Sequence, residues 1–168
     1  LARHYGFDGI VGENFRRVTY PDRTRRGLLG HGSILTLPSH ANRTSPVLRG
    51  KWLLESILGA PPPEPPADVP GLPDRGEEGE PESVRHRLER HRENPVCSSC
   101  HAPMDPLGFA MEHFDAIGRW RERDGGAEIN ATITWNGDTI DSPRAFREAL
   151  LASGDEFMHT VTERLMTY

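Results

Sequence analysis

The chain has little cysteine, few aromatic and apolar side chains, and no long hydrophobic run. Of 168 residues, 35% are hydrophobic and 7% are aromatic, while 15 are prolines and 17 are glycines. That composition is lean for a single packed core. Because no run of 18 apolar residues occurs, the sequence predicts no membrane span. The net charge of −5 gives no general case for nucleic-acid binding.

The two cysteines of the chain fall together in one short motif, Cys97-Ser98-Ser99-Cys100-His101. The pattern C-x-x-C-H is typical of covalent haem c attachment. One helical turn separates Cys97 from Cys100, so both sulfurs are expected on the same face, and His101 follows at the angle that an axial ligand needs. The motif therefore predicts one covalent haem c, bound by Cys97 and Cys100, with His101 as the proximal iron ligand.

Other uses of a C-x-x-C pair fit the sequence less well. A structural zinc site needs about four ligands, and no second Cys or His cluster accompanies residues 97–101. A thioredoxin-like redox pair follows a buried strand, whereas residues 92–96 are mostly polar and contain a proline. A third alternative is that the sequence matches the C-x-x-C-H pattern by chance and binds no cofactor. Haem c is the favoured interpretation.

Haem c attachment in bacteria takes place outside the cytoplasm, so we expect a periplasmic or otherwise exported protein. Residues 1–4 have neither the charged start nor the apolar stretch of a signal peptide, and the chain has no initiator Met. We therefore expect the chain to be a fragment of a longer exported protein. Its expected partners are a redox partner or other domains of that parent protein.

A proline-rich stretch divides the chain. Residues 61–73 contain seven prolines, which predicts a stiff, extended polyproline II spacer. Residues 74–82 are acidic and rich in helix-breaking residues, which predicts no fixed structure. We expect an N-terminal helical segment over 1–60, a Pro-rich and acidic linker over 61–82, and a cytochrome c-like module over 83–168.

Most predicted elements are helices. Before the linker, we expect a short strand over 14–20, a glycine-broken helix within 25–35, and an amphipathic helix over 47–58 with Ser45 as its N-cap and Pro46 at its first position. After the linker, we expect a basic helix over 83–93, a helix over 106–114 capped by Asp105, a hairpin with an Asn136-Gly137 turn, a helix from Ser142-Pro143 to Leu151, and a last helix capped by Asp155.

These elements predict a mainly α fold. We expect a cytochrome c-like haem-binding helical module with a small β-hairpin, preceded by a helical segment and a proline-rich linker. Phe109, Met111 and Phe114 are available to cover the haem ring. The segment 1–60 is short and glycine-broken, so we expect it to pack on the haem module or on sequence outside the chain.

Two sets of sequence blocks resemble known families of unknown function. Residues 26–35, RGLLGHGSIL, and 42–52, NRTSPVLRGKW, together with the proline run, resemble DUF1588. Residues 97–101 with 104–110, MDPLGFA, and 114–121, FDAIGRWR, resemble DUF1585. The two families occur together near the C-terminus of large exported, cytochrome c-like proteins of planctomycetes, acidobacteria and related bacteria. The resemblance implies an exported haem-bearing protein.

The sequence leaves the distal iron ligand open. A second strong ligand favours electron transfer, and an empty side favours small-molecule binding or peroxide chemistry. Met104 lies too close to His101 in sequence to reach the opposite side of the ring. Met158 also belongs to a helical stripe with Val161, Leu165 and Tyr168 that predicts core packing. The candidates for the distal position are His91, Met158, His31 and His40, whereas we expect His113 at the surface.

Three hypotheses for function follow. The first is a c-type haem-binding electron-transfer module of a larger exported protein. The second is a haem enzyme domain with an open distal site, of peroxidase-like character. The third is a non-catalytic interaction or scaffold domain. A low-spin, six-coordinate spectrum with a reversible potential favours the first hypothesis, and a high-spin spectrum that shifts with cyanide favours the second.

Overall fold

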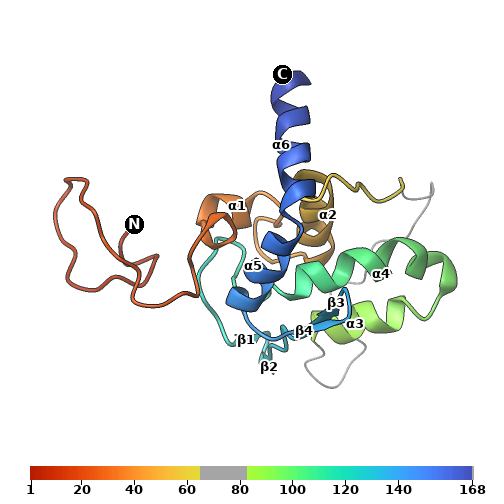
Figure 1. The fold of residues 1–168 in the computed structure, drawn as a ribbon. Coiled ribbons are helices and arrows are strands. Elements are labelled where there is room, and N and C mark those ends of the chain that lie inside the picture. Colours follow the sequence, from red (N-terminus) through yellow and green to blue (C-terminus); the bar gives the residue numbers. More distant parts are fainter. Residues whose placement is uncertain (65–82, 168) are drawn as a thin grey trace.

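The computed structural model describes residues 1–64 and 83–167 (Figure 1). These residues form a mainly helical fold with two small antiparallel hairpins. The elements are a 3-10 helix η1 (Leu28–Gly30), α1 (Gly32–Thr36), α2 (Pro46–Ser56), α3 (Val84–His91), α4 (Pro95–Phe109), β1 (Arg123–Asp124), β2 (Ala127–Glu128), β3 (Ile133–Trp135), β4 (Asp138–Ile140), α5 (Pro143–Ala152) and α6 (Gly154–Thr167).

Helices α2 and α4 form the centre of the fold. The start of α2 is as predicted, because the Ser45 side chain accepts a hydrogen bond from the Leu48 backbone amide and Pro46 occupies the first turn. The two helices approach each other closely at glycines. A Cβ at Gly50 would overlap the Met104 carbonyl oxygen, and a Cβ at Gly108 would overlap the Pro46 carbonyl oxygen. The backbones of α2 and α4 therefore touch without intervening side chains.

One hydrophobic core joins the segments on either side of residues 65–82. Leu53 and Ile57 come from α2 and its C-terminal cap, and they belong to the same buried cluster as Leu107 of α4 and Phe146 of α5. The helices of the segment 1–60 thus pack on the part of the chain after residue 83, while the loop around Phe15 does not. The predicted linker falls mostly outside the described residues.

Arg49 of α2 is a charged side chain inside this core, with 0% of its surface exposed. Its guanidinium donates hydrogen bonds to the carbonyl oxygens of Met111, Phe114 and Asp115 at 2.9, 2.6 and 2.7 Å. Burial lowers the pKa of Arg49 to about 10, and Glu112 opposes that shift. Arg49 therefore links α2 to the segment that follows α4 through hydrogen bonds.

Glu112 connects Arg49 to Thr44 and Arg121. Its carboxylate accepts hydrogen bonds from Thr44 at 2.9 Å and from Arg121 at 3.0 Å. Burial raises the pKa of Glu112, while Arg49 and Arg121 act in the opposite direction. Two arginines thus share one buried carboxylate, so the charge of Glu112 is compensated inside the protein.

The predicted hairpin is confirmed. Strands β3 and β4 pair in antiparallel register, with Ile133 opposite Ile140. The turn residues Asn136 and Gly137 both have positive φ angles, as a two-residue hairpin turn requires. A second hairpin, β1–β2, turns at the glycine pair at 125–126, where the sequence suggested only a break.

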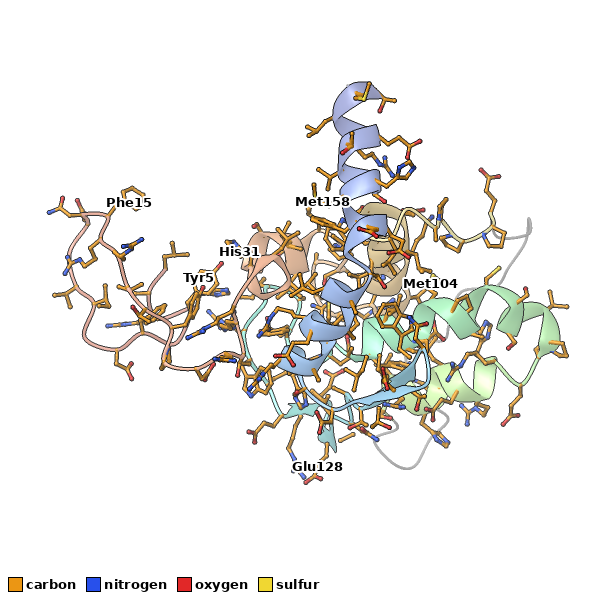
Figure 2. All side chains as sticks on the ribbon, in the orientation of Figure 1. Tyr5, Phe15, His31, Met104, Glu128 and Met158 are labelled. Atoms are coloured by element: carbon orange, nitrogen blue, oxygen red, sulfur yellow. The ribbon has the colours of Figure 1, made fainter. Side chains whose placement is uncertain are left out.

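The predicted strand over 14–20 is wrong. No strand forms there, and Phe15 is fully exposed on the loop that extends from the body of the structure (Figure 2). The alternating pattern is present, but among the described residues no neighbouring strand pairs with its backbone. A strand needs such a partner for its hydrogen bonds.

The predicted packing of the last helix is also wrong. Helix α6 begins at Gly154, so Asp155 lies inside its first turn and is not the cap. The helix projects from the body (Figure 1), which leaves Met158 60% exposed and Leu165 75% exposed. Tyr168, the end of the predicted stripe, lies outside the described residues. In the described part of the chain, no helix is long and apolar enough to cross a membrane.

Candidate functional site

Helix α4 carries the whole C-x-x-C-H motif in its first two turns. It begins at Pro95, and the Asn94 side chain caps it by accepting a hydrogen bond from the Val96 amide at 3.0 Å. The predicted helix over 106–114 is therefore wrong in its bounds, because one helix runs from Pro95 to Phe109. Asp105 lies inside this helix and does not cap it.

Two prolines inside α4 explain why the sequence predicts a helix that begins only at residue 106. Pro103 and Pro106 have no amide hydrogen to donate to the carbonyls of Ser99 and Ala102, four residues earlier. Both of those residues are exposed, so water can satisfy the two carbonyl oxygens. The helix continues because the lost hydrogen bonds face solvent.

The motif presents three reactive groups along one face of α4. Cys97 and Cys100 are free thiols, each half-buried, and they are one turn apart. His101 is half-buried and follows within the same turn. This end of α4 lies at the edge of the described structure with α3 packed beside it (Figure 1). Val96, next to Cys97, leaves 68% of its surface exposed.

His101 is held by a carboxylate of its own helix. Its Nδ1 atom lies 2.9 Å from Oδ1 of Asp105, one turn later. Asp105 is fully buried, and its second oxygen, Oδ2, lies 3.7 Å from Nε of Arg92 on the neighbouring segment. The contact with Asp105 uses Nδ1 of His101, and within the described residues the Nε2 atom has no hydrogen bond.

His91 of α3 lies directly against His101. The two ring centroids are 4.9 Å apart and the rings meet edge to face at 75°. Burial lowers the pKa of His91, with His101 acting in the same direction and Asp105 opposing it. Because the rings are in contact, no flat macrocycle fits between them in this arrangement. His91 would have to move away from His101 to reach the far side of a porphyrin.

The other histidines and methionines considered above as iron ligands lie elsewhere. Figure 2 places His31, at the start of α1, and Met158, on α6, away from the end of α4 that carries the motif. His40 is exposed on the loop before α2. Met104 is buried where α4 meets α2. His113 stacks on Trp120 at 4.6 Å and its Nδ1 bonds to a backbone carbonyl.

The apolar residues expected to cover a haem ring are in the protein core instead. Phe109, Met111 and Phe114 are each no more than 3% exposed. Phe109 also has the guanidinium groups of Arg85 and Arg92 at 5.0 and 6.0 Å from its ring. The expectation that these three residues cover a cofactor is therefore not met. They belong to the opposite half of α4 and to the chain that follows it.

In the described part of the chain, no three or more His, Cys, Asp or Glu side chains are grouped to hold a metal ion. A structural zinc site with about four protein ligands needs such a group. Haem does not, because its porphyrin supplies four equatorial nitrogens and the protein adds axial ligands only. The donor set of residues 97–101 therefore fits a covalent haem better than a bare ion.

The family comparison matches residues 25–124. The matching family is described as PSCyt3, Protein of unknown function (DUF1588). The chain belongs to this family. The match confirms the DUF1588 resemblance, and it runs through the Cys97–His101 motif and the block that resembles DUF1585. No curated protein and no solved structure matches the chain.

Proposed function

We propose that this chain is a c-type haem-binding electron-transfer module of a larger exported bacterial protein. Cys97 and Cys100 would hold one haem c, and His101 would be the proximal iron ligand. The observation that carries the proposal is the presentation of two free thiols and one imidazole along one face of a single helix. The abbreviation in the family name PSCyt3 is in keeping with a cytochrome-like role.

Covalent attachment of the haem to the two thiols needs no added oxidant. Each thiol adds across one vinyl group of the porphyrin, so that sulfur bonds to one vinyl carbon and the thiol hydrogen goes to the other. Both thiols must therefore be reduced and accessible, and both are free and half-buried. The bound haem supplies a one-electron couple between ferric and ferrous iron.

In this proposal the haem covers the N-terminal half of α4. The N-terminal half of α4 has an exposed apolar residue, Val96, beside half-buried thiols. A porphyrin there would cover this half of α4 as α2 covers the other half.

A second candidate is a haem centre with an open distal side. The observation that favours it is the position of the candidate ligands: His91 contacts the His101 ring itself, and Met158 and His31 lie on other parts of the described structure. An open side would permit small-molecule binding or peroxide chemistry. The partners of either centre would be a redox protein, or other domains of the parent chain.

The test is to export the chain to a bacterial periplasm together with the cytochrome c maturation machinery. A pyridine haemochrome spectrum then identifies thioether-linked haem. Electron transfer predicts a low-spin, six-coordinate spectrum and a reversible potential. A high-spin spectrum that shifts on adding cyanide supports the second candidate. Colourless protein, obtained while a known cytochrome matures in the same cells, contradicts both and leaves an interaction domain.

A further inference from the structure

Asp105 occupies a position that packing alone does not explain. It is a carboxylate with 0% exposure in the middle of a helix, and none of the described residues forms a hydrogen bond with its Oδ2 atom. Burying a charged group is costly unless it is paired and hydrogen-bonded. Arg92 lies 3.7 Å from its Oδ2 atom and His101 lies 2.9 Å from its Oδ1 atom. His91, in contact with the His101 ring, is also close enough for Asp105 to act on its pKa.

The hydrogen bond decides which nitrogen of His101 carries the proton. An ionised carboxylate only accepts hydrogen bonds, so Nδ1 of His101 must be the donor to Asp105. In the neutral ring the second nitrogen, Nε2, then has a free lone pair. That tautomer is the one required of a metal ligand, and a carboxylate on the other ring nitrogen increases the basicity of the ligand.

We propose that Asp105 is the positioning residue of the iron ligand: it fixes His101 with Nε2 free and, through its buried negative charge, stabilises ferric over ferrous iron. This inference rests on the proposed haem site. The charge acts strongly because water does not reach Asp105. Arg92 lies 3.7 Å from the other carboxylate oxygen, Oδ2, and offsets part of that charge.

The first experiment measures the midpoint potential of the matured protein with Asp105→Asn. Asparagine has the same shape and can still accept a hydrogen bond from Nδ1, but it carries no charge. We expect haem content to be unchanged and the potential to rise. A tenfold change in the ferric-to-ferrous preference corresponds to about 59 mV for a one-electron couple, and we expect at least that.

Glu93→Gln provides the matched control. It removes the same charge from an exposed residue close to Arg92 in sequence. Solvent screens an exposed charge, so the potential should shift much less than with Asp105→Asn. Equal potentials for wild type, Asp105→Asn and Glu93→Gln, each with haem attached, would overturn the role of Asp105 while leaving the haem proposal intact.

A second measurement does not need haem. Nitrogen-15 NMR of the histidine rings in the haem-free chain reports which nitrogen bears the proton. We expect the neutral His101 ring to be protonated at Nδ1 in the wild type, and to lose that preference in Asp105→Ala. A wild-type ring protonated at Nε2 contradicts the inference, even where Asp105→Asn attaches no haem. Absence of haem from the wild type counts against the proposed function alone.

Discussion

The two halves of α4 differ in what covers them. The C-terminal half contains Leu107 and Phe109, both buried, and its Gly108 touches the backbone of α2. The N-terminal half contains Cys97, Cys100 and the exposed Val96. The rest of the protein covers the C-terminal half, and we propose that a cofactor covers the N-terminal half. Fold stability and function should therefore respond to substitutions in different halves.

The largest expected change in stability comes from Arg49→Met, beneath the C-terminal half. The substitution leaves three backbone carbonyls and Glu112 without their buried cation. Removing one partner of a buried charge network costs about 3–5 kcal/mol. Urea unfolding of the haem-free chain measures this loss.

Lys51→Met is the control for Arg49→Met. It makes the same change from a cation to methionine on α2, but Lys51 is exposed and pairs with Glu55 at the surface. The expected effect is within about 0.5 kcal/mol. Similar losses for the two variants would show that Arg49 does not fasten the chain after α4.

A smaller loss of stability is expected for Gly50→Ala. The added Cβ would overlap the Met104 carbonyl oxygen, so α2 and α4 must separate. Overpacking of this kind costs about 1–3 kcal/mol. Gly154→Ala is the control, because a Cβ there meets no atom within 4 Å. Equal melting temperatures for Gly50→Ala and Gly154→Ala would contradict close packing of the two helices.

Local signals in the sequence predicted much of the fold. The Ser45-Pro46 start of α2, the Asn136-Gly137 turn and the Ser142-Pro143 start of α5 are all confirmed, because each depends on residues within a few positions. The strand over 14–20 fails since its pattern cannot supply a pairing partner.

The sequence likewise predicts one part of the candidate site and not the rest. The C-x-x-C-H motif on one helix was readable from spacing, as the structure bears out for the helix. The contact between Asp105 and His101 is not predicted, because the prolines at 103 and 106 indicate a helix boundary and make Asp105 look like an N-cap. Arg49 was missed because its acceptors lie more than 60 positions away in the chain. A histidine followed four residues later by an aspartate was the signal available for the first contact.

The double variant Cys97→Ala/Cys100→Ala tests the other half of the comparison. Both thiols are half-buried and lie near the exposed end of α4. The free energy of unfolding of the haem-free chain should therefore change by no more than about 0.5 kcal/mol. Covalent haem, measured after periplasmic maturation, should be absent. A large loss of stability would assign the cysteines a structural role.

The smallest effect is expected for Met158→Leu on α6. Met158 is 60% exposed and projects away from the motif end of α4. The absorption spectrum of the haem-loaded protein should match that of the wild type, and stability should change by less than about 0.5 kcal/mol. Loss of a six-coordinate spectrum in this variant would identify Met158 as the distal ligand and require α6 to move.

The most direct test of the central claim is the intact mass of the wild-type chain after periplasmic maturation, measured under denaturing conditions beside the double cysteine variant. We expect the wild-type mass to exceed that of the bare polypeptide by one haem, and the variant to have the bare mass. A wild-type chain of bare mass, from cells that mature a reference cytochrome c, would contradict it.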